Sequence, residues 1–207
     1  MSTLYTNARF WSSGKEIFHD LLVKDSLILA VGEDVKKFTA ETTIDLDDAF
    51  VIPAFLDGHA HPIFAGREAA GPKINGITSI EEIKAQVKAF ADANPSITWI
   101  IGGAYEAAII EGGDFDAKWL DEVVSDRPVV LHAVDHHTIW VNSKALELAG
   151  ITSATKDPQG GTIARNSDGS AKGTLREPSA MALVLDHAPA NTLESDVAAI
   201  KYACREY

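Results

Sequence analysis

The chain has 207 residues, 46% of them hydrophobic, with one cysteine and a net charge of −12. An acidic surface argues against nucleic acids and anionic membranes as partners, and a single cysteine excludes an internal disulfide and fits a reducing compartment. The first residues lack the features of a signal peptide and no apolar run is long enough to span a membrane, so we expect a cytoplasmic protein.

Residues 1–50 have the pattern of short strands separated by turns. Strands are predicted at residues 4–11, 19–24, 27–31 and 42–46. Between the second and third of these, Asp25-Ser26 is predicted to form the two-residue turn of a hairpin. This part of the chain is therefore expected to form a small β-structure of its own.

Residues 51–62 read VIPAFLDGHAHP, an apolar run that ends in two histidines, His59 and His61. Alternate residues of a strand point to the same face, so Asp57, His59 and His61 are predicted to project together from the end of a buried strand. Two neutral imidazoles side by side form half of a site for zinc or a similar divalent ion. The alternative for an isolated His-x-His is a pair of hydrogen-bonded structural histidines.

The rest of the chain mixes helical and strand patterns. Strands are predicted at residues 97–104 and 129–134, helices at residues 79–94, 114–124, 143–149, 178–185 and 193–207, and a β-hairpin at residues 157–177. A strand, a helix and a second strand in succession are typical of a βαβ unit with a parallel sheet. The fold class predicted from these patterns is α/β.

Two parts of the chain resemble a known family. Residues 53–61, PAFLDGHAH, resemble the lead-in and the His-x-His of the first barrel strand in the amidohydrolase superfamily, with Ala54 where the family usually has glycine. Residues 127–151 and the run GTLRE at 173–177 resemble amidohydrolase family 3, the branch with the YtcJ-like and N-substituted formamide deformylase-like enzymes. His136 stands where that branch has glycine.

The resemblance implies a domain organisation. Residues 1–50 would form the N-terminal half of a small β-sandwich, and residues 51–207 the first part of a (β/α) TIM-type barrel with the hairpin at 157–177 inserted. A complete barrel of this type needs about 250 residues, so the barrel is expected to be incomplete in this chain. Exposed edges of parallel strands favour association, so a homo-oligomer is predicted.

The resemblance also implies a metal-dependent hydrolase that cleaves a non-peptide carbon–nitrogen bond of the amide or N-formyl type in a small-molecule substrate. A divalent metal, expected to be zinc as one or two ions, would be held by His59, His61 and Glu177. Asp57 would orient a metal-binding side chain through a hydrogen bond, and a pairing with a nearby backbone group is the alternative for this residue. For Glu177, an ordinary exposed charge after the hairpin is the alternative.

His137 and Trp140 are expected to contact the substrate, although a loop histidine without a ligand role is the alternative for His137. The general-base aspartate of the family has no counterpart in these residues and is expected downstream, so no catalytic residue is assigned and the chain is expected to be inactive alone. The alternative function is a non-catalytic metal- or ligand-binding module. His132 is predicted to be a core histidine, and Cys204 a packing residue.

Overall fold

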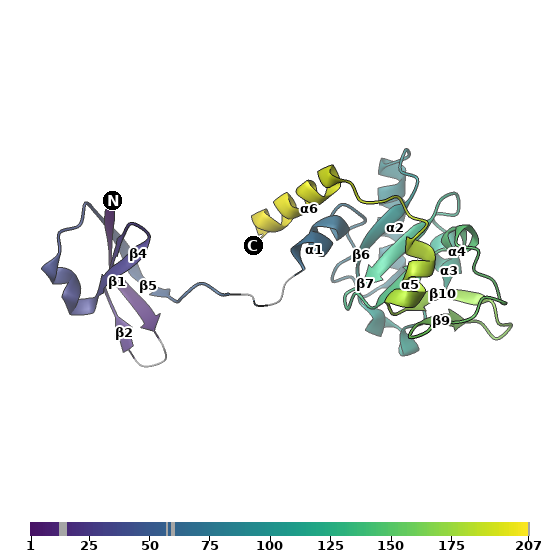
Figure 1. Cartoon of the computed structure of the whole chain (residues 1–207), viewed down its shortest axis with the longest axis horizontal. Coiled ribbons are helices and arrows are strands. Elements are labelled where there is room, and N and C mark those ends of the chain that lie inside the picture. The colour runs from purple at the N-terminus through teal and green to yellow at the C-terminus, as the bar shows by residue number, and fades with distance from the viewer. Residues whose placement is uncertain (13–15, 57, 59–60, 207) are drawn as a thin grey trace. The chain divides into compact units, whose positions relative to one another are not determined.

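The computed structural model describes residues 1–12, 16–56, 58 and 61–206. The chain divides into two compact units, Met1–Ala60 and His61–Tyr207, each with its own β-sheet (Figure 1). This division falls after residue 60, and the predicted domain boundary after residue 50 stays a prediction. No helix in the described ranges has the length and apolar character needed to cross a membrane.

The first unit is a mixed sheet of five strands. They are β1 (Ser2–Ser12), β2 (Glu16–Phe18), β3 (Leu21–Lys24), β4 (Leu27–Val31) and β5 (Thr42–Val51), with a 3-10 turn at Gly32–Lys37. The strand β1 pairs antiparallel with β2 and β3 and parallel with β5. The predicted hairpin at Asp25-Ser26 is confirmed, because β3 and β4 pair antiparallel and both turn residues have positive φ, 49° and 65°.

Few side chains are buried in this first unit. Phe10, Leu22 and Val35 are buried, and the rings of Phe10 and Phe18 stack with their centroids 5.2 Å apart. Leu27 and Ile28 on β4 remain largely exposed. The apolar surface that this sheet removes from water is therefore small.

Among the described residues of the segment 51–62, no strand follows Val51. The strand β5 ends at Val51, and residues 52–56 belong to no strand. Phe55 and Leu56 are 90% and 97% exposed, so this apolar run is not buried. A parallel strand is stabilised by hydrogen bonds to a neighbour and by burial on both faces, and these residues have neither. The residues Asp57 and His59 of this prediction lie outside the described residues.

The second unit contains the remaining elements. They are α1 (Pro62–Glu68), α2 (Ile80–Ala93), β6 (Ile100–Tyr105), α3 (Ala117–Asp121), β7 (Val129–Ala133), β8 (Thr138–Val141), α4 (Ser143–Leu148), β9 (Thr162–Arg165), β10 (Ala171–Arg176), α5 (Pro178–Leu185) and α6 (Leu193–Glu206), with 3-10 turns at Ala107–Ile109 and Glu111–Gly113. The helix α2 starts as predicted at Ser79, whose hydroxyl accepts a hydrogen bond from the Glu82 amide.

The sheet of this unit has the order β6-β7-β8-β10-β9. The predicted βαβ unit is confirmed, because β6 and β7 are parallel with α3 between them in the chain. The strand β8 was not predicted, and it pairs antiparallel with β7. The α/β class is thus confirmed, but within the described residues the sheet is mixed and open, and no closed barrel forms.

Helices cover both faces of this sheet. Alternate residues of β7 divide between two hydrophobic clusters, with Val129 and Leu131 in the cluster that includes α2, and Val130 in the cluster that includes α4 and α5. Both clusters are closely packed and nearly free of water contact. The ends of the central strands are therefore held on a rigid support.

The predicted hairpin at 157–177 is confirmed as β9 and β10, which turn at Gly169 with φ of 84°. Within β10, Gly173 has φ of 133°, and a Cβ at this position would collide with the backbone of Ala117. The glycine of the GTLRE run is therefore required by backbone conformation and by the close approach of α3. It sets the path of the chain toward Glu177.

Asn142 links four segments through its buried side-chain amide. Its Oδ1 accepts hydrogen bonds from the amides of Val129 and Ala145, both at 3.0 Å. Its Nδ2 donates to the carbonyl oxygens of Val124 and Arg127, both at 2.9 Å. This residue caps α4 as predicted, and it also ties the start of β7 to the end of the α3 segment.

We predict that Asn142→Ala lowers the free energy of unfolding by about 2–4 kcal/mol, because a helix cap is lost and buried backbone groups are left without partners. The measurement is urea unfolding followed by circular dichroism. Asn191→Ala, at an exposed position, is the control and should leave the unfolding free energy nearly unchanged. Equal midpoints for both variants would contradict the role assigned to Asn142.

Candidate functional site

His61 lies at the start of α1, where it is the N-cap residue ahead of Pro62. Residues 61, 64 and 68 are spaced to lie on one face of this short helix. The ring of His61 lies 5.6 Å from the ring of Phe64 and 6.5 Å from the ring of His136, measured between centroids. The histidine that ends the predicted motif is therefore placed next to the turn between β7 and β8.

Glu177 and His137 are brought together by the pairing of β8 with β10. Thr138 is opposite Arg176 in this pair, so the residues just beyond them, His137 and Glu177, also face each other. The Nδ1 of His137 lies 3.0 Å from Oε2 of Glu177, and the Glu177 amide donates to the His137 carbonyl oxygen at 2.7 Å. Two residues predicted for the same site from separate motifs are thus in contact.

The backbone at Glu177 is strained. Its φ is 68°, a value that non-glycine residues rarely adopt, and it directly precedes Pro178 at the start of α5. Such a conformation persists only where the surrounding structure enforces it, and it is found disproportionately at functional sites. Here the β10 pairing before Glu177 and the helix after it hold the carboxylate against His137.

Electrostatics in this pair favour the protonated imidazole. The hydrogen bond and the charge of Glu177 raise the pKa of His137, and Asp135 adds to this effect. The Oδ1 of Asp135 also accepts a hydrogen bond from the His137 amide at 2.8 Å, which fixes the turn that carries the histidine. Both side chains of the pair are at least half exposed, so a substrate or an ion could reach them.

The predicted metal ligands are only partly described. His61 contacts Phe64 and His136, whereas Glu177 contacts His137, and His59 and Asp57 lie outside the described residues. Within the described part of the chain, no three His, Cys, Asp or Glu side chains are arranged to hold a metal ion. The structure therefore does not bring His61 and Glu177 together with a third described donor.

Trp140 was expected to contact the substrate, but it lies in the core. Its exposed fraction is 0%, its ring packs against Phe115 and Tyr105, and its Nε1 donates to the carbonyl oxygen of Asp116 at 3.0 Å. The strand β8, which sequence analysis missed, turns this side chain into the sheet interior. With no exposed surface, Trp140 stabilises the fold and has no access to a substrate in this structure.

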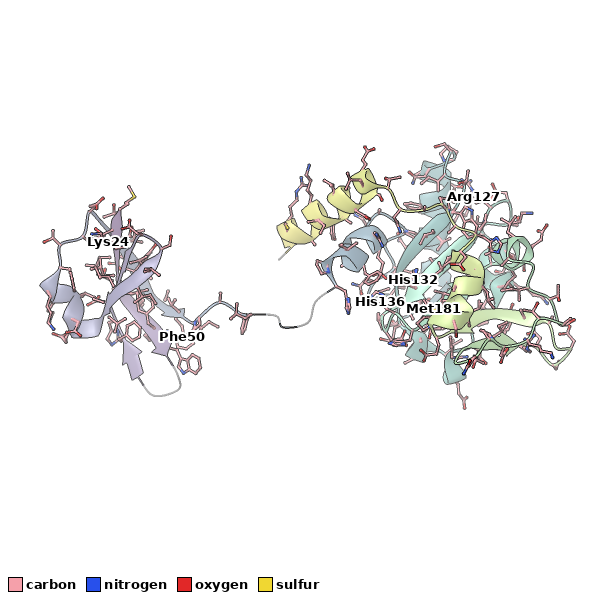
Figure 2. The ribbon with its side chains drawn as sticks, viewed as in Figure 1. Lys24, Phe50, Arg127, His132, His136 and Met181 are labelled. Carbon is pink, nitrogen blue, oxygen red and sulfur yellow. The ribbon has the colours of Figure 1, made fainter. Side chains whose placement is uncertain are left out.

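A second group of polar side chains was not predicted as a site. Glu68, His132 and His136 line a cavity of about 1290 Å³ together with Met181, and the last three are labelled in Figure 2. The Nδ1 of His136 lies 3.4 Å from Oε1 of Glu68. Glu68 is far from both histidines in the sequence, and the only sequence signal was a histidine at 136 where the related branch has glycine.

Burial changes the ionisation of two of these residues. It raises the pKa of Glu68 to about 7. It lowers the pKa of His132 to about 4, with a smaller contribution from the nearby His136. His132 is therefore a largely buried neutral imidazole, in keeping with its predicted place in the core, although it also forms part of the cavity wall.

The sequence profile of amidohydrolase family 3, described as an amidohydrolase family, matches residues 42–207. The chain belongs to this family. The match includes the His-x-His run, the β7–β8 turn and the GTLRE run that ends at Glu177. The residues in contact at the end of β10 are thus part of the segment that carries the family's pattern.

Individual relatives show the same relationship. Protein LONG AFTER FAR-RED 3 of Arabidopsis thaliana is 33% identical over 87% of this chain and 32% of its own length. YtcJ of Bacillus subtilis (strain 168) is 35% identical over 74% of this chain and 30% of its own length. N-substituted formamide deformylase of Arthrobacter pascens is 28% identical over 77% of this chain and 31% of its own length. The chain spans about a third of the length of these relatives.

Solved structures support the fold. An uncharacterized metal-dependent hydrolase from Pyrococcus horikoshii OT3 aligns with a TM-score of 0.60 at 21% identity, over 100% of this chain and 40% of that chain. An uncharacterized metal-dependent hydrolase from Pyrococcus furiosus aligns with a TM-score of 0.57 at 20% identity, over 100% of this chain and 42% of that chain. At this level of identity the likeness concerns the fold alone.

The pKa of His137 provides a test of the pair at the end of β10. Because Glu177 raises this pKa, the contact stabilises the protein below the unfolded pKa of histidine and is lost as the pH rises through the folded pKa. We predict that Glu177→Gln lowers the pKa of His137 in metal-free protein, measured by NMR titration of the imidazole. Glu111→Gln is the control, and an unchanged His137 titration in Glu177→Gln would show that the contact is absent in solution.

Proposed function

We propose that the chain supplies metal-binding and substrate-binding residues of a hydrolase that cleaves an amide or N-formyl carbon–nitrogen bond in a small molecule. The observation that carries this proposal is the contact of Glu177 with His137 at the end of β10, within the segment matched by the amidohydrolase family. The similarity to a protein named N-substituted formamide deformylase favours the N-formyl type of bond.

A divalent metal is part of this proposal, with zinc as the expected ion, one or two per chain. His59 and His61 would provide imidazole nitrogens and Glu177 a carboxylate oxygen, which together suit zinc. The described residues alone do not form a three-donor group, so the proposed site requires His59. When bound, the metal would supply a Lewis acid for the substrate carbonyl and an acidified water.

The residues of this chain would position the substrate. Since Nδ1 of His137 is held by Glu177, its Nε2 is the ring nitrogen that would donate a hydrogen bond to a substrate oxygen. The raised pKa of His137 favours the protonated ring and strengthens such a bond. Asp135 accepts a hydrogen bond from the His137 amide, and this bond would keep the imidazole positioned opposite Glu177.

The metal ligands can be tested without any substrate. We predict that the purified chain binds zinc at up to two ions per molecule and that the double variant His59→Ala/His61→Ala loses most of it, because two imidazole donors are removed. The measurement is metal content by mass spectrometry after dialysis against trace zinc. The control His187→Ala changes a surface histidine and should keep the parent's zinc content. Equal zinc content in the double variant would refute the ligand assignment.

Hydrolysis by this chain alone is tested separately from metal binding. We predict that these 207 residues alone release no formate from N-butylformamide above the blank in the presence of zinc, because the aspartate expected to act as general base is not among them. The measurement is a coupled formate assay at several pH values. Formate release that depends on zinc and is lost in His59→Ala/His61→Ala would support the hydrolase while overturning the expectation that the chain is inactive alone.

A further inference from the structure

The helix α6 packs along α1 in the second unit, and this contact uses only one side of α6 (Figure 1). Ala199 and Ala203 are 3% exposed, and the backbone of Ala199 lies so near Gly66 of α1 that a Cβ on this glycine would collide with it. Arg67 of α1 pairs with Asp196 of α6 at 2.6 Å. Residues 196, 199 and 203 therefore define the side of α6 that faces α1.

A separate apolar stripe runs along α6. Its members recur at intervals of four, three and four residues, and they are Leu193, Val197, Ile200 and Cys204. Leu193 is 81% exposed, Val197 43% and Ile200 41%. Cys204 was predicted to be a packing residue, but it is exposed as well. Apolar residues with this spacing form the seam between the helices of a coiled coil, so the stripe suits a second helix.

The charges beside the stripe determine which helix fits it. Glu194 and Lys201 are seven residues apart and lie on the same flank, so this flank is acidic in the first half of α6 and basic in the second. Among the described residues, neither of them takes part in an ion pair. Asp196 on the other flank is already paired with Arg67. When two such helices pair antiparallel, the acidic half of one flank meets the basic half of the other.

We propose that the stripe of α6 is the contact surface of a homodimer, in which the helices of two copies pack antiparallel about a twofold axis. Val197 of one copy would pack against Ile200 of the other copy, and Leu193 against Cys204. Glu194 would pair with Lys201 of the other copy. The twofold axis repeats each contact, so a short surface provides two copies of every pair. This inference does not depend on the proposed hydrolysis.

The first test is the mass of the full chain in solution, measured by sedimentation equilibrium with a reducing agent present. The helix has 14 residues, so the contact is smaller than a standard protein interface. We therefore expect a dissociation constant on the order of 100 μM. A chain that stays monomeric at several times this concentration would overturn the inference, and the stripe would then belong to another occupant, such as the additional chain length of the relatives.

A charge in the stripe should prevent the pairing. Ile200→Glu places a carboxylate in the middle of the seam and should raise the dissociation constant at least about tenfold. Tyr202→Glu is the matched control, because Tyr202 is 43% exposed on another side of the same helix. It should dimerise as the parent does, and circular dichroism checks that both variants keep their helices. Equal dissociation constants for Ile200→Glu and the parent would contradict the role of the stripe.

An exchange of charges separates pairing from folding. Glu194→Lys alone, or Lys201→Glu alone, places like charges opposite each other in the antiparallel pair and should weaken self-association about fivefold. A mixture of the two single variants restores opposite charges at both contacts, so it should associate about as tightly as the parent. A mixture that associates no better than either variant alone would refute the pairing of Glu194 with Lys201.

Disulfide cross-linking tests the orientation of the helices. In the variant Leu193→Cys, residue 193 of one copy lies opposite Cys204 of the other copy, so diamide, which takes up the two thiol hydrogens, should cross-link the dimer. The parent has one cysteine, and the antiparallel arrangement separates the two Cys204 residues by about 16 Å along the helices. The parent should therefore cross-link at least about tenfold more slowly. Faster cross-linking of the parent than of the variant would indicate parallel helices and overturn the proposed arrangement.

Discussion

The chain reversal between β7 and β8 is the constraint on which the polar sites of the second unit depend. His136 sits in this turn with φ of 57°, a left-handed conformation that costs a non-glycine residue roughly 1–2 kcal/mol. The reversal makes β8 antiparallel to β7 and carries the chain into the pairing with β10. His137 then faces Glu177, while the side chain of His136 reaches Glu68 and His61. One turn thus positions His137 against Glu177 and His136 against Glu68 and His61.

Packing and hydrogen bonds fix the sheet beneath this turn. The sheet carries a packed hydrophobic cluster on each face, and the buried amide of Asn142 joins the start of β7 to the segment after α3. A strained backbone at Glu177 can persist only on such a support, because the local conformation would otherwise relax. Rigid placement matters for a hydrolase, since catalysis depends on holding charged groups at fixed positions before the substrate arrives.

Two carboxyl groups of this unit, Glu177 and Glu68, differ in environment, and they therefore differ in chemistry. Glu177 is half exposed and its Oε2 lies 3.0 Å from the Nδ1 of His137, a position suited to a contact with a cation or a protonated histidine. Glu68 is mostly buried against Gly103 without a close donor, and burial keeps it neutral up to about pH 7. The same side-chain type can therefore serve as an ionic partner in one place and as a neutral hydrogen-bonding group in the other.

The sequence by itself determined those elements whose signals are local. The capped helix at Ser79, the turn at Asp25-Ser26, the hairpin before Glu177 and the α/β class all follow from short-range hydrogen bonds, turn conformations and apolar spacing. Only the tertiary structure showed that residues 52–56 are exposed, that β8 buries Trp140, and that Glu68 meets His136. The reason is physical: whether an apolar run is buried, and which distant side chains meet, depends on partner strands and packing that no local pattern specifies.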